Sequence, residues 1–254
     1  MTEESTSTSS SSVLDFLKDK NVFVFDTETT GLPKGSPFGW GTYWDYRMND
    51  KYDSARVLSI AWSSIEKFNR NELKTDITDI KHYLRYPEGF TEITTTHIHG
   101  ISYNDVLEKG LPLHIILDKY GLGKAILDAE YVLAHNVGFD YNVLMNELYR
   151  IVTNSNDENE NNENINTDLG NKCIKHLLYL KSKNKIVCTG ELSTDICKMD
   201  FPNKTNSYLG NKKTKKYKMP KLCELYKYFY NKDFENAHSA DWDVKALLEC
   251  LKMM

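Results

Sequence analysis

An apolar run that ends in two carboxylates is the feature that most constrains how this chain can fold. Residues 22–25 are all apolar, and Asp26 and Glu28 follow with one residue between them. Side chains two residues apart on a strand point to the same side, so both acids are expected to project together from the end of a buried strand. Like charges repel and burial disfavours them, whereas a divalent cation such as Mg²⁺ takes oxygen ligands. The pattern predicts either a metal site or a strand end with two solvated acids.

The composition fits a globular intracellular protein without overall basic character. Of the 254 residues 40% are hydrophobic and 27% charged, and the formal net charge is −4. A tight binder of duplex nucleic acid is expected to be basic, so nucleic-acid contacts should come from local patches. The five cysteines are widely spaced without C-x-x-C pairs, which predicts reduced thiols in the cytoplasm or nucleus. No membrane is expected as a partner, because no apolar run approaches the roughly 18–20 residues of a span and the N-terminus lacks a secretory signal pattern.

The first part of the chain predicts a flexible leader followed by antiparallel strands. Residues 1–20 are expected to form a Ser/Thr-rich leader with a short helix at about 13–18. After the first strand, residues 33–56 are rich in glycine, aromatic and charged residues, and the aromatics either pack as a flap or stack on bases. Runs at 57–65 and 74–83 predict two further strands in an antiparallel meander.

The second part predicts helices around one short strand. A buried strand is expected at 131–134, and helices are expected at 113–120, 124–128, 139–151, 173–180, 220–230 and 239–252. Asp140 falls in the first turn of one helix, where the helix dipole favours a metal-bound carboxylate. His238 and Asp243 flank the start of the last helix. Residues 193–196 are expected to form a loop or strand edge.

Two segments of biased composition interrupt this part. Residues 154–170 hold seven Asn, five acids and no basic residue, which predicts a solvated loop without a role in the site. Residues 203–219 lie in a stretch between Phe201 and Cys223 that carries seven lysines and no acids. Such a stretch is either a solvated loop or a surface that grips phosphates.

Four short motifs then line up in a fixed order. They are D-T-E-T-T-G at 26–31, H-G-I at 99–101, A-H-N-V-G-F-D at 134–140 and H-S-A-D-W-D at 238–243. Together they resemble the DEDD exonuclease superfamily in its histidine-containing (DEDDh) branch, to which polymerase proofreading exonucleases belong. The resemblance covers about residues 21–254 as one exonuclease domain, with insertions at about 33–56, 154–170 and 203–219. It implies an α/β fold of the RNase H-like type: a mixed five-stranded sheet with helices on both faces.

The resemblance also implies a role for each matched residue. Two divalent ions, Mg²⁺ or Mn²⁺, would be held by Asp26, Glu28, Asp140 and Asp243. Clustered carboxylates need counter-charge, and two ions about 3.5–4 Å apart supply it. His238 would be the general base, since neutral imidazole has a suitable pKa near neutrality. Residues expected to contact the terminal nucleotide are Thr27, Thr29, Leu32, His99, Asn136 and Phe139.

The resemblance implies a 3′–5′ exonuclease that releases nucleoside 5′-monophosphates from single-stranded DNA or RNA ends, with a polymerase or another replication or repair protein as a partner. The alternative is a non-catalytic RNase H-like module that binds nucleic acid or protein, although a scaffold has no reason to keep clustered acids and a base. A third possibility is a structure-specific endonuclease on the same fold, which the length of the products would distinguish from an exonuclease.

Some single residues also have other interpretations. His238 could cap its helix, and Asp241 could take the place of Asp243. His82 and His176 are expected to be exposed.

Overall fold

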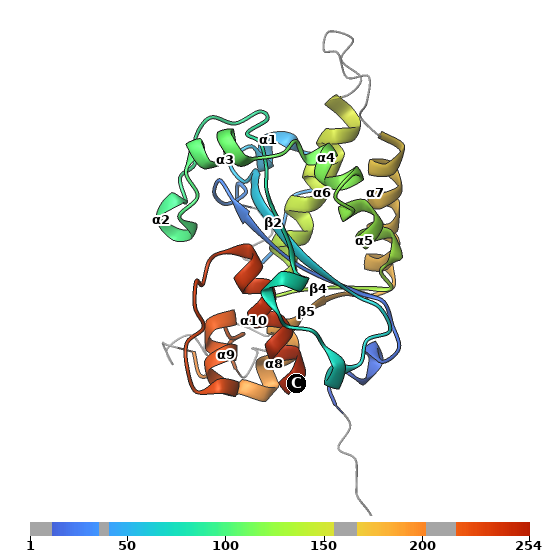
Figure 1. Cartoon of the computed structure of the whole chain (residues 1–254), viewed down its shortest axis with the longest axis vertical. Helices are drawn as coiled ribbons and strands as arrows, with labels where there is room; N and C mark the ends of the chain where they lie inside the picture. The colour runs from blue at the N-terminus through green and yellow to red at the C-terminus, as the bar shows by residue number, and fades with distance from the viewer. Residues whose placement is uncertain (1–11, 36–40, 155–166, 202–216) are drawn as a thin grey trace, which may run out of the picture.

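Five strands form one mixed sheet in the computed structural model, which describes residues 12–35, 41–154, 167–201 and 217–254. The strand order is β3-β2-β1-β4-β5 (Figure 1). Strand β1 pairs antiparallel with β2 and parallel with β4, while β2–β3 is antiparallel and β4–β5 is parallel. The strand bounds are Val22–Thr29 for β1, Val57–Ile65 for β2, Lys81–Leu84 for β3, Tyr131–Ala134 for β4 and Ile186–Cys188 for β5. The predicted mixed five-stranded sheet is confirmed.

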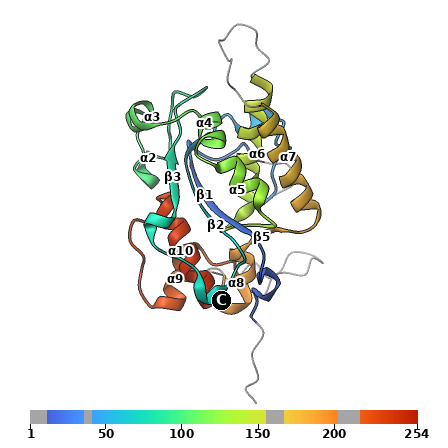
Figure 2. The same cartoon turned by 45° about the vertical axis from the view of Figure 1, so that its right-hand side comes forward.

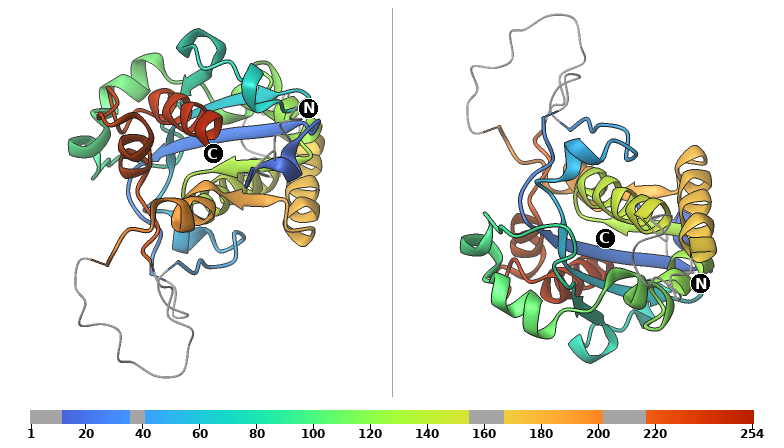
Figure 3. Two further views of the ribbon diagram at one scale, coloured as in Figure 1. Left: turned by 90° about the horizontal axis from the view of Figure 1, so that it is seen from below. Right: turned by 90° about the horizontal axis from the view of Figure 1, so that it is seen from above.

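Helices cover both faces of the sheet, as Figure 3 shows. The first face carries α4 (Leu113–Asp118), α5 (Leu122–Asp128), α6 (Val137–Asn154) and α7 (Thr167–Ser182). The second carries α8 (Thr189–Cys197), α9 (Leu222–Tyr230) and α10 (Ala240–Met253). The described residues also form three short helices, namely α1 (Asn49–Tyr52), α2 (Thr96–His99) and α3 (Tyr103–Lys109). No helix in the described ranges is both long and apolar enough to pass through a membrane.

Strand β1 is the centre of this arrangement because its apolar residues alternate between the two faces. Phe23 and Phe25 are fully buried in the cluster beneath α4–α7. Val22 and Val24 are buried in the cluster beneath α8–α10. Burial of each such side chain is worth roughly 1.5–3 kcal/mol. With one face covered by each set of helices, the strand register that carries Asp26 and Glu28 is strongly specified.

The third strand is shorter than predicted and overlaps only the end of the predicted range. Instead of 74–83, β3 spans Lys81–Leu84 at the edge of the sheet (Figure 2). The preceding residues form two 3₁₀ turns, η2 (Arg70–Glu72) and η3 (Ile77–Asp79). Asn69 and Asp76 cap these turns by accepting hydrogen bonds from the backbone N–H groups two residues on. These local bonds give the backbone an alternative to strand pairing, which is why the prediction was wrong.

Four further segments differ from the prediction. Residues 193–196 belong to α8 rather than a loop, and residues 167–170 form the first turn of α7 rather than part of a loop. Helix α9 begins at Leu222 after the N-cap residue Lys221, so Pro220 precedes the helix. In place of the predicted helix at 13–18 there is a single 3₁₀ turn, η1 (Asp15–Leu17). The rest of the predicted Asn-rich loop and most of the predicted lysine-rich segment lie outside the described residues.

A buried ion-pair network holds the rim of the sheet to α6. Glu147 is 1% exposed, and its carboxylate accepts hydrogen bonds from Arg56 Nε at 2.8 Å and from Arg85 Nη1 at 3.0 Å. Arg56 Nη1 donates to the Gly89 carbonyl at 3.1 Å. Both guanidinium groups also lie within 5.8 Å of the Phe90 ring centroid. The network therefore fixes the segment that leads from β3 towards α2.

Candidate active site at the end of strand β1

Three carboxylates converge where strand β1 passes beneath the first turn of α10. Oxygen atoms of Asp26, Glu28 and Asp243 all lie within 4.8 Å of one another. Because Asp26 and Glu28 are two residues apart on β1, they face the same side of the sheet, which is the side that α10 covers. Their cross-strand neighbours on β2 are the small residues Ala61 and Ser59. Small neighbours leave room for α10 to bring Asp243 close.

The fourth carboxylate, Asp140, is attached to the same strand from the opposite face. Thr27 lies between the two strand acids, so its side chain points towards α6. Its backbone N–H and its hydroxyl both donate to Asp140 Oδ1, at 3.1 and 2.7 Å. Asp140 is 3% exposed and sits in the first turn of α6, where the helix dipole favours an anion. Asp140 is not one of the three converging acids, but it is close enough for its charge to raise the pKa values of Asp26 and Glu28.

Crowding and burial favour the protonated form of these carboxyl groups and raise their pKa values. Burial, with the neighbouring charges of Asp243 and Asp140, raises the pKa of Glu28 to about 8. Burial also raises the pKa of Asp243 to about 7, and it raises the pKa of Asp140 to about 7 although bonds from Thr27 oppose it. The pKa of Asp26 lies well above its usual value because of burial and the three neighbouring carboxyl groups.

The donor set fits a hard divalent cation. The converging ligand atoms are all carboxylate oxygens, which are the donors that Mg²⁺ and Mn²⁺ prefer. Raised pKa values show that the ionised cluster lacks enough positive charge of its own. A bound cation would supply that charge and favour the ionised form. Asp26, Glu28 and Asp243 could hold one directly, with Asp140 beside them.

The metal-free protein is therefore expected to lose stability as the pH rises from 6.5 to 8. The folded cluster holds protons that the unfolded chain, with ordinary carboxyl pKa values of about 4, has already lost. Stability falls with pH where the folded state binds more protons. The half-buried histidines His99 and His135 have lowered pKa values, so they oppose this trend up to about pH 7.5, by less than about 1 kcal/mol in total above pH 6.5. We expect a decrease of about 1–3 kcal/mol in the unfolding free energy over this window.

Denaturant titrations in EDTA at several pH values measure this decrease. Glu28→Gln should flatten the slope because it removes one of the proton-holding groups. Saturating Mn²⁺ should flatten it in the unaltered protein, because a cation favours the ionised carboxylates. A slope that is unchanged by both treatments would contradict the electrostatic account of the cluster.

His238 lies at the exposed edge of this cluster. It precedes α10 and has a left-handed backbone with φ of 69°, a conformation that non-glycine residues adopt rarely. Its backbone N–H donates to the Asp243 carboxylate, which couples the two residues. Across the site, His99 has a pKa lowered by burial and also by the nearby His238. The N-cap of α10 is Ser239, so His238 does not act as the helix cap.

Of the residues expected to contact a nucleotide, some are exposed to solvent and others are partly buried and held by the protein. Leu32 is 73% exposed, and Asn136 is exposed with a left-handed φ of 64°. Phe139 is half-buried at the start of α6. His99 is held on both sides: its Nε2 lies 2.9 Å from the Thr95 hydroxyl, and its Nδ1 accepts from the Ile101 N–H at 3.0 Å. Their contacts with a substrate stay a prediction.

The threonines and the glycine of the first motif build a tight turn at the end of β1. Thr29 is 6% exposed, and its hydroxyl donates to the Gly31 carbonyl at 2.7 Å. A Cβ on Gly31 would lie 2.7 Å from the Ser54 carbonyl oxygen, so this close approach requires glycine. Thr95 donates its side-chain hydroxyl to the Thr29 carbonyl at 2.5 Å. The turn thus brings Ser54 and the start of α2 against the carboxylate-bearing strand.

Sequence reasoning missed several side chains around the site. Tyr43, from the 33–56 segment, packs so closely on Gly138 that a Cβ there would be 3.1 Å from its ring. His82, expected to be exposed, lies 2.7 Å from the Ser59 hydroxyl and 3.4 Å from Asp241. An isolated histidine or tyrosine in a sequence gives no signal for such contacts, because their partners come from distant segments.

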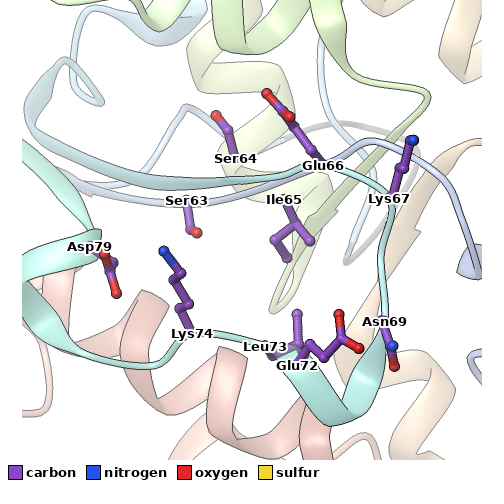
Figure 4. A pocket seen from close by; sticks show the side chains of 10 residues that line it. All are labelled: Ser63, Ser64, Ile65, Glu66, Lys67, Asn69, Glu72, Leu73, Lys74 and Asp79. Atoms are coloured by element: carbon purple, nitrogen blue, oxygen red, sulfur yellow. The ribbon is translucent and has the colours of Figure 1, made fainter.

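A polar pocket elsewhere on the surface is not part of the candidate site. It has a volume of about 370 Å³ and lies between the end of β2 and the η2–η3 segment (Figure 4). Its β2 residues Ser63 and Ile65 pair with Val24 and Val22, at the opposite end of β1 from the carboxylates. Lysines and acids line it together, which gives no charge preference for a ligand.

Comparisons with known proteins add evidence on the fold. No protein-family model and no curated protein sequence matches the chain. Solved structures of E. coli exonuclease I are similar. One complex with a dT13 oligonucleotide has a TM-score of 0.55 and 15% identity, and covers 92% of this chain and 40% of that one. A zinc-bound complex with single-stranded DNA has a TM-score of 0.54 and 13% identity, with the same coverage.

A third structure, described as suggesting how exonuclease I achieves processivity, has a TM-score of 0.52 and 14% identity, and covers 91% of this chain and 39% of that one. This chain therefore spans about two-fifths of the length of these proteins. At such identity the likeness concerns the fold. It confirms the predicted RNase H-like α/β fold class, which this chain shares with E. coli exonuclease I over most of its length.

Proposed function

We propose that this chain is a metal-dependent 3′–5′ exonuclease that acts on single-stranded nucleic-acid ends. The observation that carries the proposal is the convergence of carboxylate oxygens of Asp26, Glu28 and Asp243 within 4.8 Å. Asp140 is close enough for its charge to raise the pKa values of Asp26 and Glu28, and the His238 N–H donates to Asp243, which supports including both residues in the proposed site. The structures of E. coli exonuclease I with bound single-stranded DNA support the choice of substrate class.

In this proposal Asp26, Glu28, Asp140 and Asp243 hold the divalent ions. When bound, such ions lower the pKa of a water molecule and neutralise the charge on the phosphate and the leaving oxygen. The rigid strand and the Thr27 bonds to Asp140 hold the carboxylates in place, so that no reorganisation is needed during the reaction.

His238 is proposed to be the general base, taking the proton of the attacking water on an imidazole nitrogen. Its side chain is exposed, so it can reach a water molecule at the edge of the cluster. The hydrogen bond from its backbone to Asp243 fixes its distance from the carboxylates. Leu32, Asn136 and Phe139 are proposed to hold the terminal nucleotide beside it.

Single-stranded DNA and RNA oligomers with a 5′ label test this proposal. With Mg²⁺ or Mn²⁺, the labelled strand should shorten from its 3′ end one nucleotide at a time, and EDTA should stop the reaction. Internal fragments without such a ladder would favour a structure-specific endonuclease. Binding of the oligomers without cleavage under either metal would favour the non-catalytic module and would refute the exonuclease proposal.

His238→Ala is expected to lower kcat by about 10²–10⁴-fold, the usual contribution of a general base. Because the side chain is exposed, the variant should keep its fold and its affinity for Mn²⁺. Single-turnover kinetics with a 5′-labelled oligomer measures the loss. His114→Ala, a histidine in α4 on the other face of the sheet, is the matched control. An active His238→Ala enzyme would remove His238 from the mechanism.

A further inference from the structure

A line of polar side chains links the sheet to the first turn of α10. Ser59 on β2 has its hydroxyl 2.7 Å from His82 Nε2. His82, on β3, has its Nδ1 3.4 Å from Asp241 Oδ2. Asp241 Oδ1 in turn accepts from the Ser239 hydroxyl at 2.5 Å. Figure 2 shows β3 and α10, the elements that supply His82 and Asp241, on the same side of the molecule.

The chemistry of these groups fixes which atom donates. Asp241 Oδ1 accepts from the Ser239 hydroxyl, and the carboxylate of an aspartate offers only acceptor atoms to the histidine beside it. His82 therefore presents its Nδ1–H to Asp241, which leaves Nε2 to accept from the Ser59 hydroxyl. Donor groups therefore converge on Asp241 from both sides, from His82 on β3 and from the Ser239 hydroxyl.

Serine, histidine and aspartate in this order also form the triad of many hydrolases, but a second catalytic site is excluded here. Ser59 is 0% exposed, so its hydroxyl cannot reach a substrate. It faces Glu28 directly across the β1–β2 pair. These side chains are therefore part of the packing around the carboxylate cluster and do not bind a substrate.

This line of side chains begins beside the acids of β1 and ends beside the site residues at the start of α10. At one end, Ser59 is the cross-strand neighbour of Glu28. At the other, Asp241 and Ser239 lie beside Asp243 and His238 in sequence. Residues 235–238 of the preceding loop are exposed, so the loop itself has little packing to hold it. The contact between Asp241 and His82 restrains the start of α10 relative to the sheet.

We propose that His82 and Asp241 are positioning residues that fix His238 and Asp243 relative to the carboxylates of β1. The catalytic part of this inference rests on the proposed exonuclease function, whereas its structural part does not. Without the link, the first turn of α10 would keep its own backbone bonds, such as Asp243 N–H to the Ser239 carbonyl, but would lose its attachment to β3. Misplacement of a catalytic group by about 1 Å can cost about 10²-fold in rate.

Amide hydrogen exchange tests the structural part without any substrate. Peptides that span residues 239–247 should exchange about tenfold faster in His82→Ala and in Asp241→Ala than in the unaltered protein, because the first turn opens more often. Asp241→Asn keeps an oxygen that can accept from His82 and should restore most of the protection. His176→Ala is the matched control, since His176 bonds to the Ala129 carbonyl at 2.8 Å far from the site.

Kinetics on the same proteins tests the catalytic part. The two alanine variants should lose about tenfold or more in kcat with little change in KM, since the substrate-binding residues are untouched. The double variant should be no worse than either single one, because both remove the same link. Asp241→Asn should recover most of the rate.

The outcomes separate this inference from the proposed function. Unchanged exchange in both alanine variants, or additive losses in the double variant, would overturn the positioning role. Faster exchange with an unchanged kcat would also overturn it, since the link would then be structural alone. If the unaltered protein cleaves neither DNA nor RNA, the proposed function fails, and the exchange experiment still decides whether the link holds α10 to the sheet.

Discussion

Asp26→Asn is expected to abolish nuclease activity and, in the absence of metal, to make the protein more stable. Asp26 has a pKa raised by burial and by Asp140, Asp243 and Glu28, so its charged form destabilises the metal-free fold. A neutral amide of the same shape removes that repulsion. It also removes a proposed metal ligand from the cluster. Losing several kcal/mol of the stabilisation that a metal ion gives to the transition state lowers the rate on the order of 10³-fold.

Thermal unfolding at pH 7.5 in EDTA, together with the labelled-oligomer assay, measures both effects. A gain of about 1–2 kcal/mol should raise the Tm by about 2–8 °C for a chain of this size. Asp118→Asn, an exposed acid at the end of α4, should change neither quantity. Loss of stability in Asp26→Asn would mean that the cluster is not under electrostatic strain. Retained activity would mean that Asp26 is not a metal ligand.

Glu147→Ala is expected to have the largest effect on stability. Its removal takes the buried counter-charge from Arg56 and Arg85, which are 4% and 3% exposed, and leaves Arg85 with the half-exposed Glu88 at 3.6 Å. Despite burial, which opposes it, the two arginines lower the pKa of Glu147 to about 2, so the carboxylate is ionised throughout the physiological range. Leaving a buried charge unpaired costs about 3–5 kcal/mol.

Urea titration at pH 7 measures this loss. Asp128→Asn is the control, because Asp128 forms an exposed ion pair with Lys124 and exposed pairs contribute about 0–1 kcal/mol. Because Arg56 also bonds to the Gly89 carbonyl, the segment before α2 should lose hydrogen-exchange protection as well. A change in stability below about 1 kcal/mol would show that the two arginines find other partners.

The sequence was informative where one local pattern determined the structure. Apolar residues followed by acids two apart placed Asp26 and Glu28 on one face of a central strand, and helical spacing located α6 and α10. These elements are long or fully buried, so their patterns are strong. The mixed five-stranded sheet was implied by the resemblance to the exonuclease family, and the structure confirms it.

The sequence was not informative where the structure depends on contacts between distant segments. Strand β5 has three residues and is defined by its parallel pairing with β4, which leaves no periodic pattern to find. His82 looks like a surface residue until β3 meets α10. Glu147 occupies a helix position that is buried because two arginines from other elements neutralise it. The partners of His82 and Glu147 come from distant segments, so they can be identified only in the folded structure.

The central claim is that the carboxylates at the end of β1 form a binding site for divalent metal ions. Electron paramagnetic resonance of free Mn²⁺ during a titration of metal-free protein at pH 7.5 tests it most directly, because it needs no substrate. We expect saturable binding that approaches two ions per chain, with the tighter ion lost in Asp26→Asn and retained in Asp118→Asn. No binding by the unaltered protein, or equal binding by both variants, would contradict the claim.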